Sequence, residues 1–102
     1  MRSSDIFPSK FLRAADLNGH APIVTIERAE LRTVGDGEKL VVYFEGNEKG
    51  LVLNRTNFSA ISELTGEDDT DRWPGHKIKL VIAKVDFQGR RWPAIRIEEP
   101  ER

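Results

Sequence analysis

The sequence contains no cysteine, no long hydrophobic run and almost no net charge. The absence of cysteine excludes disulfide scaffolds, thiolate metal sites, iron–sulfur clusters and cysteine nucleophiles. No apolar stretch approaches the roughly 20 residues that cross a bilayer, and the N-terminus lacks the apolar core of a signal peptide. We therefore expect a cytoplasmic protein that has no membrane partner.

The charge balance limits the classes of ligand. There are 16 Lys and Arg against 17 Asp and Glu, which gives a formal charge of -1. Many nucleic-acid-binding domains are strongly basic, so nucleic-acid binding here would need a local cationic surface. The 102 residues suffice for one core, and we expect a single domain over 1–102. Within it, residues 1–20 form an N-terminal strap and 99–102 a polar tail.

Hydrophobic alternation and turn residues predict a mainly β chain with one helix. The predicted strands cover residues 23–31, 39–45, 51–53, 76–87 and 92–98. A helix is expected to begin at Asn54, with Thr56 and Asn57 as competing caps, and to end near Thr65. Gly66 then occupies the position where a left-handed residue ends a helix.

Two predicted strands change the face that carries their apolar residues. In residues 23–31 the apolar positions shift from Val24 and Ile26 to Ala29, and in 76–87 they shift near Ala83 and Lys84. An extra residue in one strand produces such a shift, so we predict a β-bulge in each. The order β-β-β-α-β-β, with its helix between strands three and four, predicts a small five-stranded OB-like Greek-key barrel.

Four short motifs carry a resemblance to a known family. They are LVLNRTN at 51–57, DTDRWPG at 69–75, VDFQG at 85–89 and PAIRI at 93–97. Over about residues 11–100 the chain resembles a family of small phage and prophage proteins of largely unassigned function. The resemblance implies an OB-like fold and a role near the replication or recombination of a mobile element, as a single-strand binder.

The predicted outward faces combine aromatic rings with cations, as single-strand binding requires. The candidate nucleic-acid-binding residues are Tyr43, Lys77, Lys79, Arg90, Arg91, Trp92 and Arg96. Each also has a structural interpretation. The cations suit a solvated face, Trp92 suits the closed end of a barrel, and Tyr43 suits a cross-strand pair. Trp73, beside Pro74, is interpreted as a structural plug of the core.

Enzymatic and metal-binding patterns are not found. His20 and His76 lack a second ligand at helical spacing, and Pro74 stands where a calcium loop needs glycine. We expect no catalytic residues, no metal and no cofactor, although the acidic residues 67–71 leave a weak magnesium site as the least favoured hypothesis. The partner is then single-stranded DNA or RNA. Alternatively, the chain is an interaction or assembly module that uses the last strand to associate with itself or with phage proteins.

Overall fold

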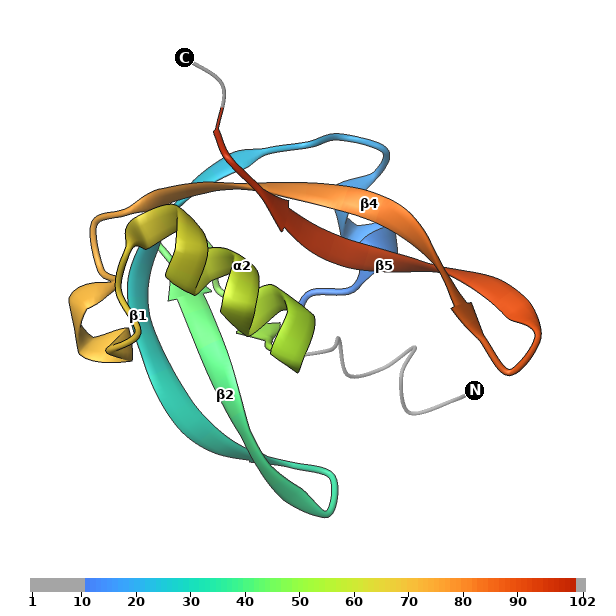
Figure 1. The fold of residues 1–102 in the computed structure, drawn as a ribbon, viewed down its shortest axis with the longest axis horizontal. Helices are drawn as coiled ribbons and strands as arrows, with labels where there is room; N and C mark the ends of the chain where they lie inside the picture. Colours follow the sequence, from blue (N-terminus) through green and yellow to red (C-terminus); the bar gives the residue numbers. More distant parts are fainter. Residues whose placement is uncertain (1–10, 101–102) are drawn as a thin grey trace.

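The computed structural model describes residues 11–100, which fold into one antiparallel sheet, one α-helix and two short 3-10 helices (Figure 1). The strands are β1 (Ile23–Val34), β2 (Gly37–Phe44), β3 (Leu51–Val52), β4 (Lys77–Phe87) and β5 (Arg90–Glu98). The helices are η1 (Ala14–Leu17), α2 (Arg55–Thr65) and η2 (Thr70–Arg72). The predicted element order is confirmed. The part of the predicted strap before Phe11, with Phe7, and the end of the tail, at 101–102, lie outside the described residues.

The strands form an open sheet in the order β3-β2-β1-β4-β5. β1 pairs with β2 from Ile26 to Val34 but with β4 only over residues 23–25. The β1–β2 and β4–β5 hairpins therefore separate, and Figure 1 shows them leaving the core in different directions. Within residues 11–100 no ladder joins β3 to β5, so the predicted closed barrel is not confirmed.

The first described segment explains why the sheet stays open. Leu12 N donates to Gly50 O at 2.8 Å, and Phe11 forms a parallel bridge with the same glycine. η1, which follows, packs on β4 and β5 and buries Leu17 in the core. Asn57 Nδ2 on α2 also donates to Ile95 O on β5, at 3.0 Å. The strap and one side chain thus occupy the place of a β3–β5 ladder, which the two-residue β3 is too short to extend.

One of the two predicted bulges is present. In β1 the partner of Ile26 is Phe44 and the next partnered residue, Arg28, lies opposite Tyr43, so the register shifts by one residue. The shift lets both Ile26 and Ala29 contact the core, as the sequence predicted.

The bulge predicted near Ala83 and Lys84 is wrong. β4 and β5 pair in continuous register from Lys79 opposite Glu98 to Phe87 opposite Arg90. Val85 therefore points outward with Trp92, its cross-strand neighbour, and not toward the core. The apolar pattern changes face because this end of the hairpin extends past the core, so its apolar residues lie on the outer surface.

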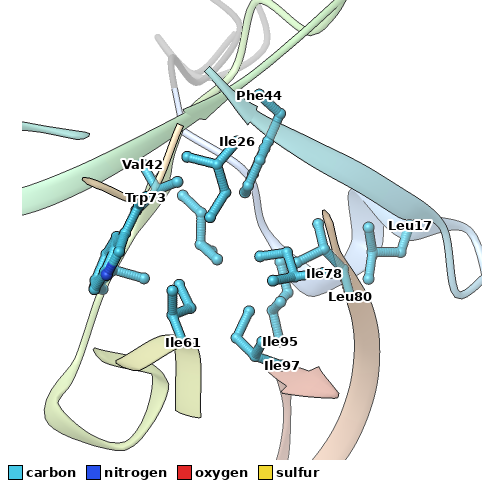
Figure 2. Packing of buried hydrophobic residues seen from close by; sticks show 12 residues of the cluster. Leu17, Ile26, Val42, Phe44, Ile61, Trp73, Ile78, Leu80, Ile95 and Ile97 are labelled. Carbon is cyan, nitrogen blue, oxygen red and sulfur yellow. The ribbon is translucent and has the colours of Figure 1, made fainter. Parts of the chain in front are cut away.

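The core collects side chains from every layer (Figure 2). Its buried members are Leu17, Ile26, Val42, Phe44, Leu51, Leu53, Ile61, Trp73, Ile78, Leu80, Ile95 and Ile97. α2 begins as predicted, because Asn54 Oδ1 accepts from Asn57 N at 2.8 Å, and it ends at Gly66, whose φ is 72°. Trp73 is fully buried against Phe58, with ring centroids 5.2 Å apart, so its predicted role as a core plug is confirmed.

Asp16 anchors the strap electrostatically and makes its docking depend on pH. Its carboxylate accepts Arg13 N at 2.8 Å and Lys49 Nζ at 3.2 Å. The backbone hydrogen bond from Arg13 is the largest cause that holds the pKa of Asp16 below its usual value, and Lys49 adds to it. Because the pKa is lowered on folding, the carboxylate stabilises the fold above the unfolded pKa. That contribution disappears as the pH falls through the folded pKa.

We expect Asp16→Asn to lower the melting temperature by about 2–5 °C at pH 7, as the loss of a partly exposed charged contact would. The difference from the parent protein should shrink as the pH falls through the lowered pKa of Asp16, because the native carboxyl group is then protonated as well. Thermal unfolding followed by circular dichroism over a series of acidic pH values is the measurement. Asp36→Asn, in the exposed β1–β2 turn, is the control. A difference that stays the same across the whole acidic series would contradict the electrostatic role.

Candidate nucleic-acid interface

The outer face of the β4–β5 hairpin carries a row of mostly apolar side chains that are half-buried, with Trp92 exposed among them. Register places Val81 opposite Arg96, Ala83 opposite Ala94, and Val85 opposite Trp92. Adjacent positions such as Leu80 and Ile95 point into the core, so the alternation fixes this row on the other side of the sheet. We call these six residues, Val81, Ala83, Val85, Trp92, Ala94 and Arg96, the outer strip.

Trp92 is the most prominent residue of the outer strip. Its surface is 48% exposed, and a shallow depression beside it is lined by Val85, Asp86, Trp92 and Arg96. A half-exposed indole beside a guanidinium is a suitable platform for a planar, electron-rich ring with an anionic substituent. Of the structural alternatives raised for Trp92, closure of a barrel end does not apply, since the hairpin tip lies beyond the core.

Three further cations share the outer face of this half of the sheet. Lys77 and Lys79 pair with Thr25 and Ile23 of β1, so they extend the outer strip toward the centre of the sheet. Arg90 lies at the other end, in the first position of β5. With a rise of about 3.3 Å per residue, the cations span roughly 33 Å along the hairpin. Glu98, opposite Lys79, is an acidic residue within this row.

The structure separates two predicted site residues from the others. Arg91 lies opposite Asp86 and one position out of phase with Trp92, and its Nε is 3.8 Å from Asp86 Oδ1. Tyr43 lies on β2 in the other half of the sheet, where the Arg28 guanidinium covers its ring at 4.2 Å. The sequence-predicted set therefore has five members on one face, Lys77, Lys79, Arg90, Trp92 and Arg96, and two elsewhere.

The charges around Tyr43 are satisfied internally. Arg28 Nε donates to Glu30 at 2.8 Å, and Arg28 also bonds Glu27, while Arg32 donates to Glu30 at 3.2 Å. The hydrogen bond from Arg28 is the main reason that the pKa of Glu30 lies below its usual value. On the outer face of the β1–β2 hairpin Arg28 and Arg32 are thus paired with carboxylates, which disfavours phosphate binding beside Tyr43.

A second feature lies at the opening between β3 and β5, and sequence reasoning missed it. The residues that line this cavity are Leu12, Arg13, Ala14, Leu51, Val52, Asn54, Asn57, Ala94, Ile95 and Arg96. Asn57 is only 3% exposed, and its Oδ1 has no hydrogen-bond partner within residues 11–100. In the sequence Asn57 was visible only as an alternative helix cap. Nothing in the local pattern indicates that a side chain in the first turn of a helix reaches across to the last strand.

The acidic residues of the loop before β4 make hydrogen bonds within the fold. Asp69 Oδ1 accepts Asp71 N at 2.9 Å and so caps η2, while the carbonyl of Glu67 accepts the indole N–H of Trp73 at 2.9 Å. Across the described part of the chain, no three His, Cys, Asp or Glu residues gather as a metal site would require. None of its helices has both the length and the apolar character needed to cross a membrane.

Comparison with known proteins finds no significant match, whether to a family model, to a curated protein or to a solved structure.

Proposed function

We propose that this protein is a non-catalytic OB-like module that binds single-stranded nucleic acid, with little sequence preference, on the outer face of β4 and β5. The observation that carries the proposal is the half-exposed indole of Trp92, which lies across from Val85 and borders the same depression as Arg96. An aromatic ring that protrudes from a β-surface beside cations is the arrangement that stacks an unpaired base and neutralises its phosphate. The strand order and the position of α2 support the OB-like assignment.

The expected strength and salt dependence of nucleic-acid binding follow from Trp92 and the cations around it. Stacking of one base on an aromatic side chain contributes about 1–3 kcal/mol. Lys77, Lys79, Arg90 and Arg96 supply cations along the same face, whereas the net charge of -1 gives little long-range attraction. Binding should therefore be modest and should weaken steeply with salt. The resemblance to phage and prophage proteins supports a cytoplasmic role in the replication or recombination of a mobile element.

A protein partner is the second candidate function. The outer strip is mostly apolar, and on the side of β5 away from β4 no strand is paired within residues 11–100. A partly exposed apolar surface beside an unpaired edge is found at sites for self-association or for a partner protein. Pro93 lacks a backbone donor and weakens that edge for strand addition, which favours the nucleic-acid proposal over this one.

We expect oligo(dT) of about 25 nucleotides to quench the intrinsic fluorescence, with a slope of log K against log salt near −3 if each of the four cations contacts a phosphate. Trp73 is fully buried, so the quenching reports on Trp92. Because Trp92→Ala removes the fluorophore, its affinity is measured by anisotropy of a labelled oligonucleotide. It should be about 10–100-fold weaker than the parent protein.

Lys84→Gln is the matched control for Lys79→Gln. Both lysines lie on β4, but Lys84 belongs to the alternate phase that faces away from the outer strip. Loss of affinity in Lys79→Gln alone supports the assigned face. Absence of any binding at low salt would reject the nucleic-acid proposal. A mass in sedimentation that rises with concentration, and returns to that of a monomer in Trp92→Ala, would then favour the interaction module.

A further inference from the structure

The turn between η1 and β1 contains an asparagine followed by a glycine. Asn18 and Gly19 are both exposed and both left-handed, with φ values of 51° and 77°. Asn18 N donates to Ala15 O at 3.2 Å, and His20 N donates to Leu17 O at 2.8 Å. Leu17 is buried in the core, so this turn joins the docked strap to the sheet.

Both groups that react when an asparagine deamidates are unengaged in this turn. Within residues 11–100 the side-chain amide of Asn18 makes no hydrogen bond, and the backbone N–H of Gly19 has no acceptor. Glycine also lacks the side chain that would hinder attack by its own nitrogen. A Cβ placed on Gly19 would meet nothing within 4 Å, so neighbouring atoms leave the backbone room to move.

The attack requires rotation of the Asn18 backbone away from its ψ of 38°, which brings the nitrogen of Gly19 toward the side-chain carbon Cγ. The hydrogen bond that spans the rotating bond is the one from His20 N to Leu17 O. Water can replace it because residues 18–20 are all exposed. Opening of one surface turn therefore suffices for the reaction, and the core stays folded.

The other asparagines lack this combination. Asn47 Oδ1 accepts Lys49 N at 2.9 Å, and Asn54 Oδ1 accepts Asn57 N at 2.8 Å. Asn57 itself is buried within α2. The residues that follow these three asparagines all carry side chains, namely Glu48, Arg55 and Phe58. Exposure, an unengaged amide and a following glycine thus coincide only at Asn18.

We propose that Asn18 and Gly19 form a spontaneous deamidation site with water as the co-reactant. The nitrogen of Gly19 gives its proton to hydroxide and attacks Cγ of Asn18, while the bond from Cγ to Nδ2 breaks and ammonia leaves after taking a proton from water. A water molecule then opens the succinimide at either carbonyl. Opening at Cγ gives aspartate, and opening at the backbone carbonyl gives isoaspartate. The net change is asparagine plus water to acid plus ammonia, without oxidation or reduction.

The isoaspartate product should weaken the docking of the strap. Its main chain runs through Cβ and Cγ, so it adds one carbon between Leu17 and β1, and it places a negative charge in the turn. The hydrogen bond from His20 N to Leu17 O depends on the spacing of α-linked residues and cannot re-form with the same geometry. No residue of the outer strip lies in this turn, so the inference does not depend on nucleic-acid binding.

The test incubates the folded protein in mildly alkaline water enriched in heavy oxygen, and then digests it with trypsin in ordinary water for mass spectrometry. Cleavage after lysine and arginine places Asn18 in the peptide from Ala14 to Arg28. That peptide should gain one heavy oxygen at residue 18 and separate into aspartyl and isoaspartyl forms. The rate should rise with pH, because base removes the amide proton of Gly19. Peptides that contain Asn47 or Asn54 should stay unlabelled over the same period.

Asn18→Gly is the matched control, because glycine adopts the same positive φ but has no amide. It should take up no label and should melt no lower than the parent protein. Aged parent protein should melt about 4–8 °C below fresh protein. Asn18→Asp, which supplies the charge without the extra carbon, should stay within about 2 °C.

Each outcome bears on one part of the proposal. Absence of heavy oxygen at residue 18 of the folded protein overturns the deamidation site, and so does equal labelling at Asn47. Labelling at residue 18 without a fall in the melting temperature supports the site and overturns the weakened docking of the strap. An equal fall in Asn18→Asp would assign the effect to the charge and overturn the role of the lengthened main chain.

Discussion

Trp73→Ala should destabilise the fold by about 3–5 kcal/mol, which is a large part of the 5–15 kcal/mol that typically stabilises a domain. The indole is fully buried, and its Nε1 donates to the carbonyl of Glu67 at 2.9 Å. Its ring packs against Phe58 of α2, so it connects the loop before β4 to the helix. Removal would leave a cavity in the centre of the core and a carbonyl without its donor.

Backbone hydrogen bonds around Trp73 limit how far the loop can collapse into that cavity. Gly75 N donates to Ile26 O at 2.8 Å, and Ile26 N donates to His76 O at 2.9 Å. These bonds fix the loop to β1 beside its bulge, so the chain cannot move inward without breaking them. The expected fall in melting temperature exceeds about 10 °C.

Trp92→Ala is the control, because it removes the same side chain from a half-exposed position. Its effect on stability should be below about 1 kcal/mol. Urea unfolding followed by circular dichroism measures both variants. Equal unfolding midpoints for the two variants would show that the buried indole of Trp73 contributes no more to stability than the half-exposed indole of Trp92. Trp73→Phe, which keeps the ring but loses the hydrogen bond, should fall between the parent protein and Trp73→Ala.

Local sequence signals predicted the elements well, because each depends on near neighbours. Asn54 caps α2 through Asn57 N, three residues away, and Gly66 ends the helix with a positive φ. The bulge in β1 was visible because both of its apolar sets, around Ile26 and Ala29, contact the same core. The alternation of apolar and polar residues along a strand predicts which side chains are buried where that strand packs on the core.

The same alternation gave a wrong prediction in β4, at the end of the strand that extends past the core. Val85 is apolar and out of phase with Ile78 and Leu80, which predicted a bulge, yet the register of β4 is continuous. Its half-buried side chain lies on the outer face opposite Trp92, so the change of phase marks the outer strip and not a bulge. Which outcome holds depends on how far the hairpin extends past the core, a property of the whole fold.

The candidate site shows the same division between local and distant information. Lys77, Lys79, Trp92 and Arg96 came together because strand parity alone places them on one face. Arg28 covers Tyr43 only through the β1–β2 register, which depends on the bulge. The cavity between β3 and β5 requires contacts across 38 residues, from Asn57 to Ile95, and no short pattern encodes them.

Gly50→Ala should destabilise the protein by about 1–3 kcal/mol, the range expected for overpacking a rigid interior. A Cβ at this position would lie 2.6 Å from Val41 Cγ1 and 2.9 Å from Tyr43 Cε1. Val41 is fully buried and β-branched, so it has little freedom to move away. Gly50 is also the residue to which the strap attaches, through Leu12 N and the bridge to Phe11, so a shift here would disturb the strap as well.

Gly37→Ala is a matched control, since Gly37 also lies outside the positive-φ region and an added Cβ would meet nothing within 4 Å. That variant should be neutral or stabilised by up to about 1 kcal/mol, because alanine restricts the unfolded chain more than glycine does. The pair therefore separates steric overlap from backbone entropy in chemical denaturation. Equal midpoints for the two variants would mean that Gly50 is tolerated as an ordinary strand residue, and that the strap does not need the close approach to β2.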